Sequence, residues 1–113
     1  MTDQTYNGWT NYETWLVNLW MDNEQGSQEF FREQAREIYD EAEAKPYLTR
    51  DWVAIHRFAD YLKEHHEENR PEMPGVYGDL LGGALSSVNW DEIARHYIDA
   101  IVEEESNGVQ NGR

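Results

Sequence analysis

The sequence predicts an all-α fold, a compact single-domain bundle of about five helices. Apolar residues recur at helical spacing in five segments, and no segment keeps the alternation of polar and apolar residues that marks a half-buried strand. The length of 113 residues fits one domain, and five Trp, seven Tyr and three Phe supply large side chains for a core. A disordered chain would lack these side chains.

The first predicted helix follows Thr10, which forms a capping-box pattern with Glu13: Thr10 caps the start, and Glu13 reaches back to it. Gly26 ends this helix after a turn over residues 23–26. Apolar residues occupy one face and extend around the side at Val17 and Met21, so we expect this helix to be central to the core. Its main apolar face consists of Tyr12, Trp15, Leu16, Leu19 and Trp20.

Ser27 is a favourable N-cap for a second helix over residues 28–44, which Pro46 stops. Thr49 caps a third helix over residues 50–66. The predicted buried face of the second helix consists of Phe30, Phe31, Ala35, Ile38, Tyr39 and Ala42, and that of the third consists of Trp52, Ile55, Phe58, Ala59 and Leu62.

Residues 67–75, which include two prolines, are predicted to form a loop. A weaker fourth helix follows over residues 76–87. Its Gly82 and Gly83 each cost about 1 kcal/mol relative to Ala, or else let another helix approach closely. Asn89 and Glu92 repeat the capping-box pattern before a fifth helix over residues 90–104. The predicted core residues are Tyr77, Leu80, Leu81, Ala84 and Leu85 in the fourth helix, and Ile93, Ala94, Tyr97, Ile98, Ile101 and Val102 in the fifth.

We therefore expect one acidic helical domain over residues 1–105 and a flexible C-terminal tail over residues 106–113, which are polar and contain glycine. Apolar runs fall far short of the roughly 20 residues that a membrane span needs. Residues 1–7 lack the basic and apolar pattern of a signal peptide. Without cysteine, disulfides and thiolate-bound zinc are excluded. These features predict a cytoplasmic protein that has no membrane partner.

The chain is strongly acidic, with 23 Asp and Glu against 9 Lys and Arg and a formal net charge of −14. The acids are spread over the predicted helices and are not collected in a tail. Such a surface repels nucleic acid and anionic lipid, and it attracts basic protein surfaces. We therefore expect a basic protein surface as the partner and no direct contact with nucleic acid.

Acids at strict i, i+4 spacing form a row in the second predicted helix, where like charges destabilise a helix by a few tenths of a kcal/mol per pair. Arg32 and Arg36 lie between them and are expected to offset part of this repulsion. The surface could serve solubility, adaptation to high salt, or mimicry of a nucleic-acid backbone, because carboxylates about 6 Å apart along a helix can replace phosphates. The candidate partner-binding residues are Glu29, Glu33, Glu37, Glu41, Glu64, Glu67, Glu68, Asp99 and Glu103.

Residues 64–68, Glu-His-His-Glu-Glu, contain the ligand types of a metal site. Zinc sites on helices usually place two histidines four residues apart, and that spacing is absent. A solvated helix end is the better interpretation, since histidine suits the C-terminal dipole. His56 and His96 are isolated, and spacing places no nucleophile or orienting carboxylate beside either. We therefore predict no metal, no cofactor, no catalytic residues and no enzymatic activity.

Two blocks of sequence carry a family resemblance. The first is Gly8-Trp9-Thr10-Asn11-Tyr12-Glu13-Thr14-Trp15, followed by Leu19-Trp20 and Asn23, and the second is Ala84-Leu85-Ser86-Ser87-Val88-Asn89-Trp90-Asp91-Glu92-Ile93-Ala94. Together they cover about a third of the chain. The chain thereby resembles a largely uncharacterised family of small proteins from phages, plasmids and related mobile elements. The resemblance implies a mobile-element setting, in which small acidic proteins are often anti-restriction or anti-CRISPR inhibitors. It assigns no functional residues.

The sequence therefore favours a phage- or plasmid-type inhibitor that binds, in the host cytoplasm, a basic surface of a defence nuclease or DNA-binding complex. The leading alternative is a structural or assembly adaptor that binds through an apolar patch near Trp9 and Trp90, with the acidity serving solubility or salt adaptation. A third hypothesis is a small metal-dependent enzyme that uses His65 and His66. The oligomeric state stays open, a homodimer included.

Overall fold

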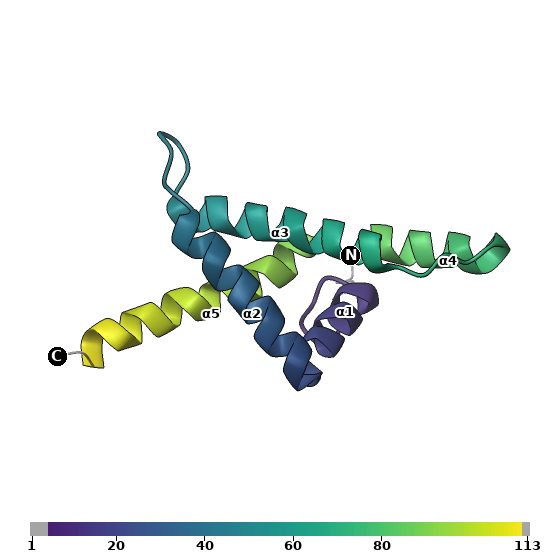
Figure 1. Cartoon of the computed structure of the whole chain (residues 1–113), viewed down its shortest axis with the longest axis horizontal. Helices are drawn as coiled ribbons and strands as arrows, with labels where there is room; N and C mark the ends of the chain where they lie inside the picture. Colours follow the sequence, from purple (N-terminus) through teal and green to yellow (C-terminus); the bar gives the residue numbers. More distant parts are fainter. Residues whose placement is uncertain (1–4, 112–113) are drawn as a thin grey trace.

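The computed structural model describes residues 5–111, which fold into five α-helices and contain no strands (Figure 1). The helices are α1 (Tyr12–Asn23), α2 (Gln25–Glu41), α3 (Arg50–Asn69), α4 (Gly75–Ser86) and α5 (Trp90–Asn111). The prediction of an all-α bundle is confirmed. Residues 1–4 and 112–113, which include parts of the predicted N-terminal segment and tail, lie outside the described residues.

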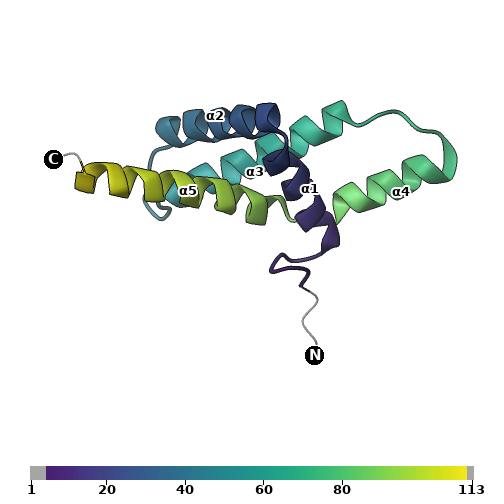
Figure 2. The same ribbon diagram turned by 90° about the horizontal axis from the view of Figure 1, so that it is seen from below.

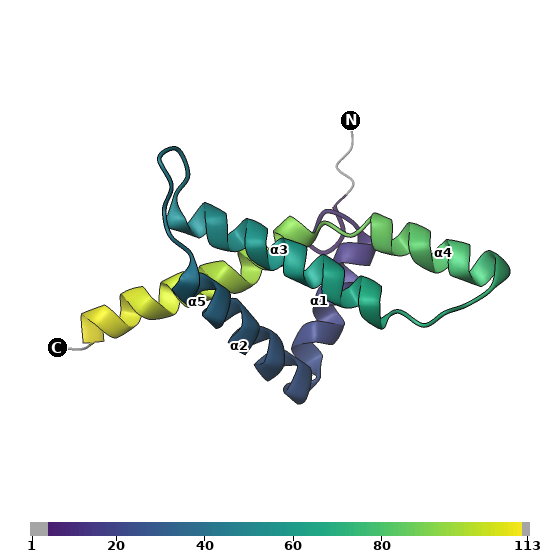
Figure 3. The ribbon, with the colours of Figure 1, turned by 45° about the horizontal axis from the view of Figure 1, so that its top comes forward.

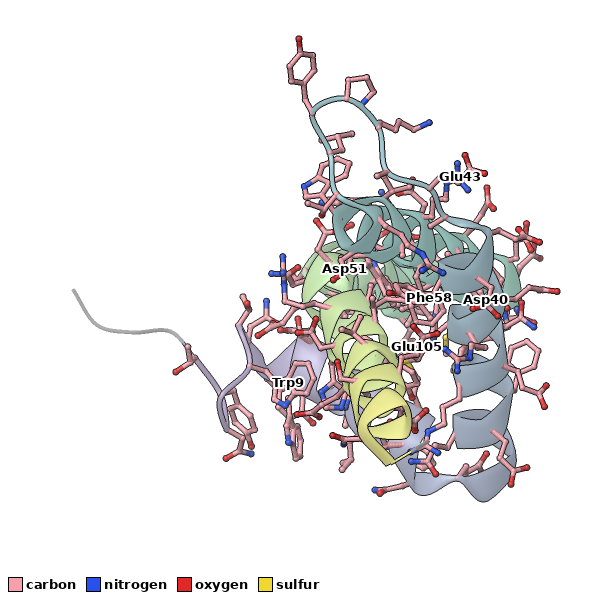
Figure 4. All side chains as sticks on the ribbon, turned by 90° about the vertical axis from the view of Figure 1, so that its left-hand side faces the viewer. Trp9, Asp40, Glu43, Asp51, Phe58 and Glu105 are labelled. Carbon is pink, nitrogen blue, oxygen red and sulfur yellow. The ribbon has the colours of Figure 1, made fainter. Side chains whose placement is uncertain are left out.

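The body of the molecule consists of α2, α3 and α5, which pack against one another (Figure 2). Phe58 of α3 lies between the three helices (Figure 4). It is fully buried, as are Leu62 of α3 and Ile93 and Ile98 of α5. Burying one such side chain contributes about 1.5–3 kcal/mol relative to leaving it exposed. The predicted apolar faces of α2, α3 and α5 are largely confirmed, with Phe30 and Trp52 as exceptions, since both are exposed.

The prediction that the first helix is central to the core is wrong. α1 packs on α2 and α5 at the edge of the body, and it buries Thr14, Asn18 and Met21. Residues two apart on a helix point about 200° apart. Leu16, which lies between Thr14 and Asn18, is therefore on the outward side, and Trp20 is 64% exposed. Tyr12 is exposed as well, and its ring packs only against neighbouring aromatic rings.

Two helix starts differ from the prediction. Asn11, not Thr10, caps α1, because the Asn11 side chain accepts a hydrogen bond from the Thr14 amide at 2.9 Å. Ser27 does not cap α2, which already begins at Gln25, so Gly26 lies inside a helix. One residue, Glu24, ends α1 and begins α2 with an extended backbone. The chain thus reverses from α1 into α2 without the predicted turn.

Thr49 and Asn89 cap α3 and α5 as predicted, but the return bond of the predicted capping box is not formed, because the Asn89 amide donates to Thr14 and the Glu92 carboxylate accepts from Thr10. Thr49 accepts a hydrogen bond from the Trp52 amide at 3.1 Å, and Asn89 accepts one from the Glu92 amide at 3.1 Å. α2 stops at Glu41, three residues early, and α3 continues to Asn69. The last helix also runs further than predicted, because residues 105–111 continue α5.

The two blocks behind the family resemblance meet at the starts of α1 and α5. The Asn89 amide donates to the Thr14 hydroxyl at 2.9 Å, and the Thr10 amide donates to the Glu92 carboxylate at 3.0 Å. Thr14 and Glu92 are the third residues of their helices, so each helix satisfies a backbone group at the start of the other. These bonds cross more than 70 positions in the sequence and hold the two helix starts together.

α4 lies apart from the body. Figure 3 shows that α3 and α4 diverge, joined by the loop after Asn69, and α4 shares few contacts with any other helix. Its prediction as a helix is confirmed, but most of the predicted core face lies outside the core: Tyr77 and Leu80 are 66% and 64% exposed. Ala84 is exposed as well, whereas Leu85 is partly buried and packs against the core. The short loops tie its ends to the body, and the fourth helix adds no layer to the core.

Candidate protein-binding surface

The predicted row of glutamates lies on the outward face of α2. Glu29, Glu33, Glu37 and Glu41 are all exposed. Glu33 and Glu37 each stand two residues from buried Ala35, so they point away from the core. The row spans 12 residues, or about 18 Å of helix. The structure thus presents the four carboxylates together along one side of the body.

The two arginines between these glutamates do not pair with the row. Arg36 turns toward α5 and bonds Glu105 at 3.0 Å. Arg32 lies at the groove between α2 and α5. Within residues 5–111 no base lies within 4.0 Å of the four row carboxylates. The expectation that both arginines offset repulsion within the row is therefore wrong for Arg36, which pairs with Glu105 of α5 instead.

The other candidate acids are exposed on α3 and α5. Glu64 and Asp99 each stand two residues from a buried core residue, so they too point outward. Glu67 of α3 lies 3.8 Å from Arg70. Glu68 of α3 and Glu103 of α5 are exposed as well. Because α2, α3 and α5 surround one core, their outward faces point in different directions. Only the α2 row places four candidate acids on one face.

The structure also brings together acids that sequence spacing did not select. Asp40 of α2, Glu43 of the following loop, Asp51 of α3 and Glu105 of α5 lie at the same end of the body (Figure 4). Nothing in the sequence could have paired them, because three different helices contribute them. Burial raises the pKa of Tyr39 at this end; the nearby Arg50 lowers it, and the charges of Asp51 and Glu105 raise it further.

Arg50 is held at this end by two contacts with Tyr39. Its guanidinium stacks 3.9 Å from the centre of the Tyr39 ring and donates two hydrogen bonds to the Tyr39 carbonyl, at 3.1 and 2.8 Å. A cation held in this way is unavailable to neutralise the outward carboxylates. This end of the body therefore keeps its acidic character.

A groove of about 330 Å³ lies between α2 and α5. Arg32 and Glu33 form one wall, and Asp22 and Tyr97 close one end. The Tyr97 hydroxyl donates to Asp22 at 2.7 Å, and the Asn18 amide donates to the same carboxylate at 2.9 Å. Burial raises the pKa of Tyr97, and the hydrogen bond to Asp22 and the charge of Asp22 raise it further. The hydroxyl is thus a donor held in place and not an acid.

The histidines at the end of α3 belong to an aromatic cluster. His66 stacks on Phe31 and packs against Trp90, and His65 packs against Phe30 and Tyr61. The His66 ring lies 2.9 Å from the Leu62 carbonyl oxygen. Burial lowers the pKa of His66, the Leu62 carbonyl raises it, and His65 lowers it again. His66 is therefore a packed, partly buried ring, whereas a solvated helix end was expected.

The other two histidines each face one carboxylate. His56 lies 3.5 Å from Asp91 and stacks on Trp52, and His96 lies 3.9 Å from Asp22. In the part of the chain that the structure describes, no group of three or more His, Asp or Glu side chains is arranged to hold a metal ion. Each of these two histidines therefore makes a single contact with one carboxylate at the surface of the bundle.

The apolar patch expected near Trp9 and Trp90 is not where the sequence placed it. Trp90 is 9% exposed and belongs to the core, and Trp9 is half-buried against the ring of His96. The large exposed apolar side chains are instead spread over α1, α2, α3, α4 and the loops, with Val76, Tyr77 and Leu80 of α4 among the most exposed. None of the helices described here combines the length and the apolar character that crossing a bilayer requires.

The family comparison covers nearly the whole chain. A family model described as a family of unknown function, DUF7249, matches residues 2–110. The chain belongs to DUF7249. No curated protein and no solved structure matches it. Membership agrees with the expectation of an uncharacterised family, and the match covers the middle of the chain as well as its two ends. The DUF7249 description carries no activity and no partner.

Proposed function

We propose that this DUF7249 protein is a non-enzymatic inhibitor that binds a basic surface of a DNA-handling complex through the outward face of α2. The proposal rests on the row Glu29, Glu33, Glu37 and Glu41. Its four exposed carboxylates share one face, and among the described residues no base lies within 4.0 Å of them. Their spacing of about 6 Å corresponds to roughly one charge for every two phosphates of a DNA strand.

The inhibition would follow from competition. A DNA-binding groove lined with Lys and Arg attracts the row for the same electrostatic reason that it attracts a phosphate backbone. Once the row is bound, DNA is excluded from the groove. The resemblance to mobile-element proteins suggests a restriction or CRISPR nuclease complex of the host cytoplasm as the target.

The test is inhibition of DNA binding. Labelled duplex DNA and a panel of restriction and CRISPR effector complexes are titrated with the protein at 50 and 300 mM salt (about 0.05 and 0.3 M, chosen to change the screening length). We expect displacement of DNA at low salt and much weaker displacement at high salt. If no member of the panel releases DNA at low salt, the proposal fails.

A matched pair of variants separates the row from net charge. E33K/E37K reverses two row carboxylates, and E43K/D60K makes the same change in net charge outside the row. E33K/E37K should weaken inhibition about tenfold or more, and E43K/D60K should weaken it only slightly. Equal losses would mean that overall acidity, and not the α2 row, is recognised.

A second candidate function is an adaptor that binds through an apolar surface. The exposure of Val76, Tyr77 and Leu80 on α4 favours it. Monomeric proteins rarely leave a contiguous apolar patch of this kind exposed without a binding role. In that case E33K/E37K would leave the activity nearly unchanged, whereas replacing the α4 residues would abolish it.

A further inference from the structure

We infer that the exposed side of α4 is a docking surface for a basic amphipathic helix of a partner protein. The inference goes beyond both proposed functions, because it names the structural class of the partner segment. We call this surface the α4 face and define it by its exposed residues Val76, Tyr77, Leu80, Gly83 and Ala84.

The α4 face is a stripe along one side of the helix. Val76, Leu80, Gly83 and Ala84 recur at spacings of three and four, which places them in line. Gly78 and Gly82 are on the opposite side, where Gly78 approaches the Met73 carbonyl and Gly82 approaches the Arg70 guanidinium. α4 thus turns Gly78 and Gly82 toward the loop that precedes it, and its Val76, Tyr77 and Leu80 side chains toward solvent.

Gly83 favours a helix as the partner segment that binds the α4 face. Gly78 and Gly82 have neighbours that a Cβ atom would meet, but a Cβ atom at Gly83 would meet nothing within 4 Å among the described residues. Glycine inside a helix costs about 1 kcal/mol relative to Ala. The fold of this chain therefore gives no reason for a glycine at position 83. Next to Leu80 and Ala84, the missing side chain leaves a notch at which the backbone of another helix can approach closely.

The charges around the α4 face select a basic partner. The hollow at the loop before α4 is lined by three acids, Glu67, Glu68 and Glu72, and by one base, Arg70, which lies 3.8 Å from Glu67. Asp79 is exposed on α4 itself, three residues after Val76. Among the described residues, no base lies within 4.0 Å of Glu68, Glu72 or Asp79, so the surroundings of the α4 face are acidic on balance. A second copy of the chain would bring the same acids and a net charge of −14 to the interface. A partner helix with an apolar stripe flanked by Lys or Arg matches both the apolar α4 face and the acids around it.

The probe for this inference is a labelled 18-residue Leu/Lys peptide with its leucines at amphipathic helical spacing. Two further peptides serve as controls: one has the same composition in a shuffled order, and one carries Glu in place of Lys. Fluorescence anisotropy with the full chain should show binding of the amphipathic Leu/Lys peptide that is about tenfold tighter than that of either control. Equal binding of the shuffled peptide would reduce the interaction to charge attraction and overturn the inference.

Variants then locate the peptide. Y77S/L80S should weaken binding about tenfold, and Y47S/W20S, which removes two exposed aromatic side chains elsewhere, should not weaken it. Gly83→Gln adds a helix-favouring side chain that blocks the notch, so it should weaken binding while α4 becomes more helical by circular dichroism. Unchanged binding in Y77S/L80S and Gly83→Gln would place the peptide elsewhere.

The oligomeric state tests the alternative that a second copy of the chain occupies the α4 face. Light scattering of the wild-type chain should report a monomer at the concentrations of the binding assay. A dimer that Y77S/L80S dissociates would assign the α4 face to a second copy and overturn the inference. Because E33K/E37K leaves the α4 face intact, this variant should still bind the peptide. Failure of the α2 proposal and failure of the α4 inference are therefore observed separately.

Discussion

At the scale of single residues, Thr14 is a polar side chain on which much of the local structure depends. It is fully buried, its hydroxyl donates to Asn11 at 2.6 Å, and it accepts the Asn89 amide at 2.9 Å. In the sequence it stands out only as a member of the first block of the family resemblance. Its partner lies 75 residues away, so its role depends on the meeting of α1 and α5.

Replacing Thr14 by valine should lower the free energy of unfolding by about 1–3 kcal/mol, because it removes the hydroxyl that accepts the Asn89 amide and one of the two bonds that Thr14 donates to the Asn11 side chain. Urea denaturation followed by tryptophan fluorescence measures the change. Thr5→Val, a substitution at an exposed residue outside the helices, is the control and should change the value by less than about 0.5 kcal/mol. A neutral effect of Thr14→Val would show that water replaces the lost bonds.

His66 should make stability depend on pH. Burial lowers its pKa in the folded state below the ordinary value of 6.5. Below pH 6.5 the unfolded chain then binds more protons than the folded chain, so this residue reduces stability as the pH falls from about 7 toward its folded pKa. Above pH 7 both states are neutral and the contribution vanishes.

Comparison with a variant isolates this contribution from that of the carboxylates. Unfolding of the wild type and of His66→Gln is measured from pH 7.5 to pH 5.5. We expect the wild type to lose stability on acidification relative to His66→Gln. Parallel curves for His66→Gln and the wild type would contradict the assignment.

At the scale of elements, α4 is distinguished by how little it packs. It has a helical sequence and a buried glycine, yet it shares few contacts with other helices. Helices derive most of their stability from tertiary packing. α4 should therefore open more readily than the three helices of the body, and its backbone amides should exchange hydrogen faster than those of α3.

Two glycine substitutions test how α4 is held. Gly83→Ala should stabilise α4 by about 1 kcal/mol, because it improves helix propensity where a Cβ atom meets nothing. Gly78→Ala makes the same chemical change where the new Cβ atom would meet the Met73 carbonyl, so it should destabilise the loop and α4. Hydrogen exchange in residues 75–86 should slow in Gly83→Ala and accelerate in Gly78→Ala. Equal effects would show that the loop does not constrain α4.

At the scale of the whole molecule, the net charge of −14 acts on the folded state as a single quantity. Acids surround the body on α2, α3 and α5, and few are paired. Like charges on a compact surface repel, and salt screens them over a Debye length of about 10 Å at 0.1 M. The fold is therefore expected to be less stable at low ionic strength.

Raising NaCl from 10 to 150 mM (about 0.01 to 0.15 M, where screening changes most) should raise the midpoint of thermal unfolding. E33K/E37K, which carries less net charge, should show a smaller increase. Differential scanning fluorimetry measures both. An equal increase in the two proteins would attribute the effect to general salt exclusion and not to charge repulsion.

The amino-acid sequence by itself determined the helices, because their signals are local. Apolar spacing within about 15 residues identified α2, α3 and α5, and the caps Thr49 and Asn89 depend on residues three positions away. The acidic row is equally local, since four glutamates at spacing four share a face on any helix. Membership of an uncharacterised family could also be anticipated from two short blocks.

Only the tertiary structure decided which apolar faces are buried. Tyr12, Trp20 and Leu80 match a core pattern as well as Phe58 does, yet they are exposed, because α2, α3 and α5 enclose the core without them. It also decided that Arg36 pairs with Glu105 and that Glu92 bonds Thr10. Spacing along the chain reports which residues share a face, but burial depends on which faces meet, and contacts across 70 or more positions determine that.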